Sequence, residues 1–253
     1  MELDFRALKR KAQSFPAIPA AYSWLRNRVR SNRRQHRPEI FDRIYRFNAW
    51  DDGDSRSGPG SNLQYTAAVR RKLPALLREL AVESLLDAPC GDYRWLSEMD
   101  LGRLSYLGVD IVKELVEQNT IAYGAAERSF FQADIVNDPL PPADLILCRD
   151  CLVHLSFAEA SRVLANFRRS GSRYLLTTTF TDRNKNFDIY TGGWRTLNLC
   201  KSPFNFPVPL LVLNEEYAGG NGQYTDKSLA LWRLEDLPVT HHDHDAAVGL
   251  ADA

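Results

Sequence analysis

Apolar and polar residues change their spacing repeatedly between residues 65 and 180, from a helical period to short continuous runs. Residues 65–80 place apolar side chains on one helical face, at Val69, Leu73, Leu76, Leu77 and Leu80. Apolar runs typical of strands follow at 84–88, 104–110, 128–134, 143–150 and 172–180. Helical spacing lies between them, at 93–100, 112–124 and 157–170. The alternation predicts a doubly wound α/β domain, with a parallel sheet covered on both faces.

The flanking segments follow other patterns. Residues 209–217 and 227–234 have the composition of two strands joined by a hairpin loop, whereas 181–209 has no clear period. Long irregular segments inside a domain are typical of lids and binding loops. Residues 1–47 are predicted to form short helices, and 49–63 a loop centred on SGPGS. We therefore expect three parts: an N-terminal helical arm and lid loop (1–62), the main domain (63–238) and a disordered tail (239–253).

Composition restricts the function only slightly. The chain is 44% hydrophobic and 25% charged with no formal net charge, which is ordinary for a soluble globular protein. Charge is uneven, however, because residues 1–46 hold twelve Lys and Arg against four acidic residues. This arm is either a solvated helical face docked on the acidic remainder, or a patch that grips phosphates or an anionic membrane surface.

The sequence contains no run of the roughly 20 apolar residues that would span a bilayer. The four cysteines, Cys90, Cys148, Cys151 and Cys200, are too few for a disulfide framework. We therefore expect a cytoplasmic protein.

The stretch LLDAPCGDYRW (85–95) is the first candidate site, because ligands of open α/β sheets bind beyond the carboxyl ends of the strands. A dinucleotide needs the glycines of G-x-G-x-x-G. This loop has one glycine, Gly91, and places Asp92 where a pyrophosphate would lie, so NAD is disfavoured. S-adenosylmethionine carries a sulfonium and an ammonium group, which suit Asp87 and Asp92.

The next two strands end in further carboxylates. Asp110 is placed to accept hydrogen bonds from both ribose hydroxyls, and Asp134 from an adenine amino group, with Ile135 covering the ring.

Taken in order, LLDAPCGDYRWL, YLGVDIV, FFQADIVNDPLPPADLILCRDCLVHLS and the closing hairpin resemble a class I S-adenosylmethionine-dependent methyltransferase over residues 60–235. The resemblance implies a seven-stranded sheet of order 3-2-1-4-5-7-6 with strand 7 antiparallel. Of the family's D/E-x-G-x-G-x-G pattern, only the middle glycine is present. The implied cofactor-binding residues are Asp87, Ala88, Pro89, Gly91, Asp92, Asp110, Ile111, Asp134, Ile135 and Arg149.

Asp150 and His154 are the candidate catalytic residues, because they follow the fourth strand at the mouth of the expected site. Either side chain can take a proton from an oxygen acceptor as that acceptor attacks the methyl group. His154 can instead cap or pack a helix. Cys148 and Cys151 have the spacing of a redox pair or half a zinc site, but the remaining zinc ligands are missing, so we expect two buried thiols and no metal.

The irregular segment 181–209 is the candidate acceptor wall, with Trp194, Arg195 and Asn205 as substrate-binding residues. The alternative is a surface loop that packs its own aromatic side chains. Asp182 and Asn184 offer oxygens to an acceptor or to Mg²⁺. Trp50 and SGPGS (57–61) are placed to fold over the cofactor as a lid.

These features predict O-methylation of a small molecule or glycan. A nucleic-acid methyltransferase that uses residues 6–46 is the first alternative, although the N-P-P-[YF] tetrad of adenine methylation is absent from the fourth strand. A non-catalytic scaffold or sensor that binds the cofactor is the second.

Overall fold

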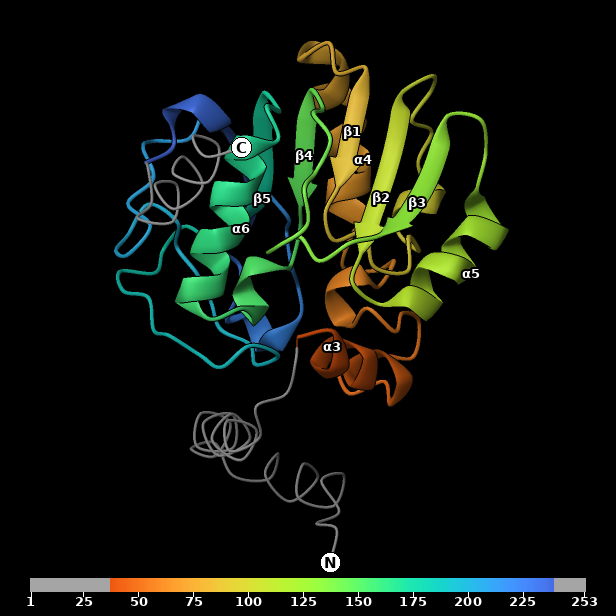
Figure 1. Cartoon of the computed structure of the whole chain (residues 1–253). Helices are drawn as coiled ribbons and strands as arrows, with labels where there is room; N and C mark the ends of the chain where they lie inside the picture. The colour runs from red at the N-terminus through yellow and green to blue at the C-terminus, as the bar shows by residue number, and fades with distance from the viewer. Residues whose placement is uncertain (1–36, 239–253) are drawn as a thin grey trace, which may run out of the picture.

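The structure, a computed structural model, describes residues 37–238. A seven-stranded sheet of order β3-β2-β1-β4-β5-β7-β6 forms its centre, with β7 antiparallel to both of its neighbours (Figure 1). The strands are β1 (Ser84–Asp87), β2 (Ser105–Asp110), β3 (Arg128–Gln132), β4 (Leu145–Cys148), β5 (Tyr174–Phe180), β6 (Leu211–Asn214) and β7 (Lys227–Arg233). The helices are α3 (Arg37–Arg46), α4 (Ala67–Glu79), α5 (Lys113–Tyr123) and α6 (Phe157–Arg169). The predicted fold class and strand order are confirmed.

The sheet separates two hydrophobic cores because neighbouring residues of a strand point to opposite faces. In β4, Ile146 belongs to the core beneath α6, whereas Leu145 and Leu147 belong to the core beneath α4 and α5. Every residue of β4 and β5 is buried, which explains their continuous apolar runs.

One predicted helix is wrong. Residues 93–100 contain only a 3-10 turn at Leu96–Glu98. Tyr93 has a φ of +56°, a left-handed conformation that interrupts a right-handed helix. Its fully buried ring packs edge-on against Tyr106 and Phe130. The apolar residues of this stretch therefore fill the core from an irregular chain.

Helix α3 and the segment after it lie at the edge of the sheet towards which the arrowheads of β2 and β4 point (Figure 1). The predicted helix at the end of the arm is therefore present, and it lies over the carboxyl ends of the parallel strands. The rest of the basic arm (residues 1–36) and the tail (239–253) lie outside the described residues. Within 37–238, no helix has the length and apolarity needed to cross a membrane.

Candidate active site

The loop after β1 is covered directly by residues 49–62, which we call the lid. Gly91 has a φ of +54°, and a Cβ at this position would lie 2.6 Å from Ser57 Oγ in the lid. The backbone N–H of Asp92 donates to Ser57 Oγ (2.8 Å), and Ser55 Oγ donates to Asp92 Oδ2 (2.6 Å). Asp92 therefore ties the lid to the loop, and a larger residue at 91 would push the two apart.

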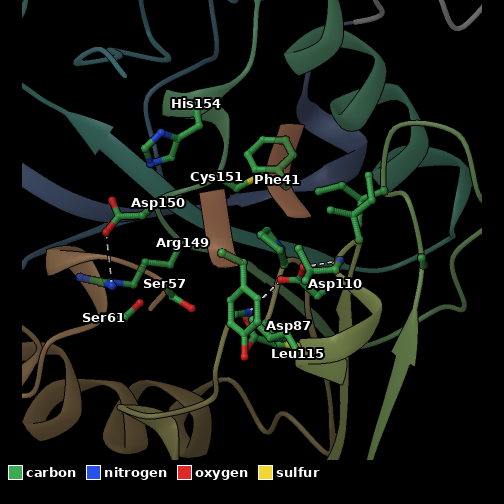
Figure 2. Close-up of a pocket in the computed structure, with 18 of the residues that line it drawn as sticks. Phe41, Ser57, Ser61, Asp87, Asp110, Leu115, Arg149, Asp150, Cys151 and His154 are labelled. Atoms are coloured by element: carbon green, nitrogen blue, oxygen red, sulfur yellow. Dashed lines mark hydrogen bonds and ion pairs between the residues drawn. The ribbon is translucent and has the colours of Figure 1, made fainter. Parts of the chain in front are cut away.

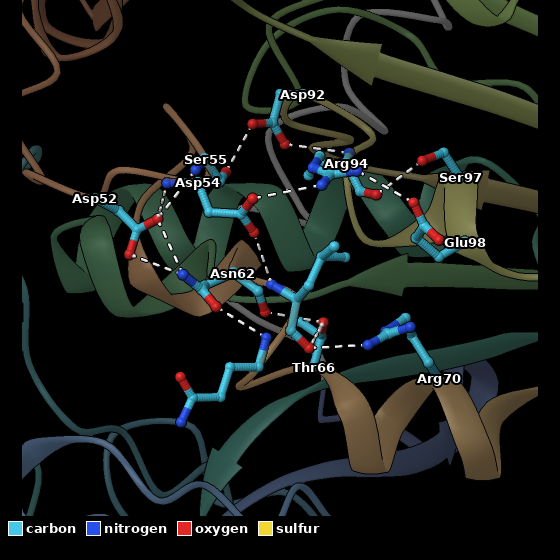
Figure 3. Close-up of polar contacts among 12 residues, drawn as sticks. Asp52, Asp54, Ser55, Asn62, Thr66, Arg70, Asp92, Arg94, Ser97 and Glu98 are labelled. Atoms are coloured by element: carbon cyan, nitrogen blue, oxygen red, sulfur yellow. Dashed lines mark hydrogen bonds and ion pairs between the residues drawn. The ribbon is translucent and has the colours of Figure 1, made fainter.

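The lid has a defined internal structure (Figure 3). Asp52 Oδ1 accepts hydrogen bonds from the backbone N–H groups of Asp54 (2.8 Å) and Ser55 (3.0 Å). Asp54 Oδ2 accepts from the backbone of Leu63 (3.0 Å), and its other oxygen pairs with Arg94 at 3.4 Å. The acidic residues of this segment therefore fix its turns, as short polar side chains commonly do.

Beneath the lid, a first cavity opens at the carboxyl edge of the sheet. Ten of the predicted residues line it: Asp87, Pro89, Gly91, Asp110, Ile111, Asp134, Ile135, Arg149, Asp150 and His154. Figure 2 shows Asp150 and His154 at one end of this cavity and Asp87 and Asp110 at the other. Ala88 is fully buried and, like Asp92, does not line the cavity.

Two buried carboxylates, Asp87 and Asp110, face this cavity without a cationic hydrogen-bond partner. Asp87 Oδ2 accepts from the hydroxyl of Tyr106 (2.7 Å), and Asp110 accepts from the backbone N–H groups of Gly91 (3.1 Å) and Val112 (3.0 Å). Burial raises the pKa of Asp87 to about 8 and that of Asp110 to about 6, although these hydrogen bonds act to lower both values. A cationic ligand would favour the ionised form of both groups, whereas a phosphate would disfavour it.

Asp134 belongs to a separate ion-pair group at the wall formed by α3. Its carboxylate pairs with Arg37, the first residue of α3, and Arg37 also pairs with Glu159 (3.1 Å). Phe41 and Tyr45 of the same helix line the cavity. The apolar spacing that includes Phe41 and Tyr45 predicted the helix, and the helical arm was expected to be an accessory cap, but the sequence did not indicate which of its side chains would line the cavity.

Four charged side chains form a cluster on the other side of the cavity: Arg149, Glu215 and Lys227, which are buried, and Asp150, which is partly buried. Both Glu215 oxygens accept from Arg149, at 3.2 Å and 2.6 Å, and Lys227 Nζ donates to Asp150 Oδ2 at 2.6 Å. Arg149 Nη1 also donates to the carbonyl oxygen of Gly60 (2.6 Å), so the cluster holds the lid. We call these four residues the charge cluster.

The charge cluster keeps Asp150 ionised. Burial acts to raise the pKa of Asp150, but Lys227 and then Arg149 outweigh it, and the pKa falls to about 2. Asp150 therefore carries its charge at neutral pH and does not act as a proton acceptor there. Glu215 and Lys227 were not among the predicted residues, because they lie on the closing hairpin, 66 and 77 positions from their partners.

His154 ends a 3-10 turn (Leu152–His154) that residues 190–195 hold in place. Backbone hydrogen bonds join Gly192 N–H to the carbonyl of His154 (2.8 Å) and Arg195 N–H to that of Val153 (3.1 Å). His154 Nδ1 lies 2.7 Å from the carbonyl oxygen of Gly193. Because a carbonyl only accepts, Nδ1 carries the hydrogen, and Nε2 is the accepting nitrogen of the neutral ring.

A second cavity meets the first beside His154. It is lined by Ala49, Trp50, Ser57, Gly58, Pro59, Gly60, Asp150, His154, Phe180, Trp194, Tyr217, Tyr224 and Lys227. Four of these residues, Trp50, Ser57, Asp150 and His154, line both cavities. The ring of Trp50 packs against that of His154, with centroids 4.7 Å apart. The predicted catalytic residues therefore lie between two adjoining cavities.

Of the three predicted substrate-binding residues, only Trp194 lines a cavity. Arg195 is buried, its guanidinium lies over the ring of Phe157 (5.0 Å), and its Nη1 donates to the carbonyl oxygen of Leu152 (3.0 Å). Asn205 is exposed and borders neither cavity. Arg195 thus stabilises the turn that carries His154, and its side chain borders neither cavity. Its guanidinium packs against the ring of Phe157 instead of facing a ligand, which could not be predicted from residue type alone.

The cysteines carry free thiols. Burial raises the pKa of Cys90 well above its usual value, and Cys151 has a raised pKa through its hydrogen bond to Cys148 and its burial. Both shifts favour the unreactive thiol. Among residues 37–238, no group of three or more His, Cys, Asp and Glu is arranged to hold a metal ion.

Glu215→Gln is expected to lower the free energy of unfolding by about 3 kcal/mol, because it leaves two buried cations facing a single carboxylate. Glu216→Gln is the matched control: the neighbouring carboxylate is 53% exposed and pairs only with Arg71 and Lys72 at the surface. Urea denaturation of the two variants checks this. Equal midpoints would contradict the importance of the cluster.

Asp87→Asn is expected to stabilise the ligand-free protein, increasingly so as pH rises. The pKa of Asp87 is 3.8 ordinarily and about 8 in the folded chain, so between these values only the folded state retains the proton. Raising the pH across this window therefore lowers the free energy of unfolding. Melting temperatures at pH 5, 6, 7 and 8 should show a difference between variant and parent that widens as pH rises. A constant difference would contradict the raised pKa of Asp87.

Comparison with known proteins identifies the fold. Neither the family models nor the curated proteins contain a match. Among solved structures, human N-acetylserotonin methyltransferase in complex with SAM is similar, with a TM-score of 0.51 and 18% identity, over 85% of this chain and 67% of that one. Magnesium protoporphyrin IX methyltransferase from Synechocystis is also found (TM-score 0.41, 17% identity, 60% of this chain and 76% of that one). So is the N-methyltransferase NodS from Bradyrhizobium japonicum (TM-score 0.44, 14% identity, 54% of this chain and 73% of that one).

The chain spans about two thirds of the first solved chains it matches. With its strand order, the likeness to the human enzyme shows that residues 37–238 have the class I methyltransferase fold.

Proposed function

We propose that this protein is an S-adenosylmethionine-dependent methyltransferase that methylates an oxygen of a small molecule or glycan. The observation that supports this best is the meeting of two cavities at Trp50, Ser57, Asp150 and His154. The first cavity is lined by Asp87 and Asp110, which have no cationic hydrogen-bond partner, and several aromatic rings line the second. A group-transfer enzyme needs such a junction, because donor and acceptor must be held in contact and in line.

The first cavity suits the proposed cofactor. When bound, S-adenosylmethionine supplies a methyl group on a cationic sulfur. Asp87 and Asp110 would balance its positive charges, and Asp110 retains free lone pairs for the ribose hydroxyls beside the two backbone groups that it accepts. Asp134 would face the adenine, with Arg37 holding the carboxylate in place. Asp92 contributes through the lid instead of through the ligand.

At the junction, His154 would remove the acceptor's proton. Its Nδ1 hydrogen bond to Gly193 leaves Nε2 as the accepting atom, and Trp50 covers the ring. Asp150 would remain ionised and stabilise the imidazolium once the proton has moved. The lid would exclude water from this exchange.

The two alternatives have less support. Most of the basic arm lies outside the described residues, and Arg37 and Arg46 of its described part pair with acidic residues of the domain. Arg37, whose side chain is largely buried, is therefore not displayed to a phosphate. A scaffold that only binds a cofactor needs no second cavity and no histidine between the two cavities.

Free thiols at Cys148 and Cys151 are consistent with a cytoplasmic location.

S-adenosylhomocysteine is expected to bind the full chain with measurable heat, whereas NAD is expected not to bind. Asp110→Ala should weaken S-adenosylhomocysteine binding by about 1–3 kcal/mol, because hydrogen bonds to a charged acceptor are lost. Isothermal titration calorimetry measures both. Asp100→Ala, which changes an exposed aspartate outside the first cavity, serves as the control. Binding of NAD alone would refute the cofactor assignment.

His154→Gln is expected to lower kcat by at least about 100-fold while changing the Kd of S-adenosylhomocysteine far less, because the main lost function is proton removal. Formation of S-adenosylhomocysteine should be measured with an acceptor found by screening hydroxylated small molecules. If kcat falls only slightly, the base is elsewhere and His154 is a packing residue.

A further inference from the structure

Aromatic rings form a large part of the wall of the second cavity. Phe180, Trp194 and Tyr224 contact one another edge to face, with centroids 5.1–6.2 Å apart. Trp50 and Tyr217 add two further rings, so that five of the thirteen lining residues are aromatic. Such rings offer flat apolar surface to a ligand that lies against them.

The charges that line this cavity cancel one another. Asp150 is paired with Lys227 at 2.6 Å, and Lys227 also lies 3.4 Å from Glu215 and over the ring of Tyr217. Arg149 and Glu215 complete the charge cluster with one charge of each sign. A charged acceptor would therefore lose its hydration without gaining an unpaired counter-charge, which is costly between apolar walls. An uncharged acceptor avoids this penalty.

The polar side chains that line the cavity are mostly paired ions, Asp150 and Lys227, or aromatic side chains with a single polar atom each. None of the lining residues is Asn, Gln or Arg. Burial raises the pKa of Tyr217 to about 12 and also raises that of Tyr224, so both hydroxyls remain protonated. A sugar ring carries several hydroxyls that each need a partner, whereas the aromatic side chains of this wall offer at most one polar atom each. A ring with one hydroxyl needs only His154 Nε2 and a donor such as a tyrosine.

From these three observations, we infer that the acceptor is an uncharged, flat aromatic ring whose single hydroxyl receives the methyl group. This inference rests on the proposed function and narrows it from a small molecule or glycan to one chemical class. In the transfer, the phenolic O–H bond breaks, its proton goes to His154 Nε2, and the oxygen forms a bond to the methyl carbon. The bond from that carbon to the sulfonium sulfur breaks, leaving a neutral thioether.

Four probes of matched size test the assignment. The full chain, saturated with S-adenosylhomocysteine, is titrated calorimetrically with 4-ethylphenol (neutral), tyramine (cationic), 4-hydroxyphenylacetate (anionic) and methyl α-glucoside (a sugar). 4-Ethylphenol is expected to bind at least about tenfold more tightly than each of the others, because only it matches both the apolar walls and the balanced charges. With S-adenosylmethionine in place of the product, it should be converted to its methyl ether.

Trp194→Ala is expected to weaken 4-ethylphenol binding by at least about tenfold and to leave S-adenosylhomocysteine binding unchanged, because the indole belongs only to the second cavity. Trp194→Phe keeps an aromatic wall and should restore most of the affinity, which a purely structural role would not predict. Phe187→Ala is the control: this ring is 72% exposed, lies on the same segment and borders neither cavity.

The outcomes separate the two proposals. If S-adenosylhomocysteine does not bind, the proposed function fails. If it binds but the glucoside is preferred, a charged phenol is preferred, or none of the four probes binds, the cofactor assignment stands and the acceptor class is wrong.

Discussion

The charge cluster fixes the lid, the end of β4 and the closing hairpin relative to one another. Its two positive and two negative side chains pack together where the two cavities meet. Glu215 from the closing hairpin binds Arg149 after β4, Arg149 binds the carbonyl oxygen of Gly60 in the lid, and Lys227 from β7 binds Asp150. Each ion is costly to bury alone, so each is tolerable only while the others are present. The position of the lid, the charge of Asp150 and the electrical neutrality of the second cavity all depend on this one group of contacts.

Much of the fold was predictable because its determinants are local. The periods of apolar residues located all seven strands to within a few positions, and the carboxylates that end β1 and β2 pointed to a cationic ligand before any geometry was known. Asp87 and Asp110 indeed share the cavity with Asp134, because parallel strands bring their carboxyl ends to one edge. The helix expected at 93–100 failed because Tyr93 and its neighbours fill the core, and burial outweighs local propensity.

The rest depends on contacts between residues that are distant in sequence. Glu215 carries no motif, and its role appears only when the hairpin packs beside β5. Arg37 looked like one more charge of a basic arm, although it binds Asp134 and Glu159. Arg195 had the right chemistry for a substrate and lies instead behind the turn that carries His154. Residue type suggested which groups react with ligands, but only packing decides which way a side chain faces.

The left-handed backbone conformation of Tyr93 affects which nucleotides the first cavity would bind. Because the chain after β1 does not continue into an α-helix, its backbone N–H groups are not aligned towards the ligand as the positive end of a helix dipole would be. An abundant nucleotide such as ATP would therefore find no helix N-terminus after β1 to bind its phosphates. Discrimination against phosphorylated ligands would thus be built into the backbone of a single loop.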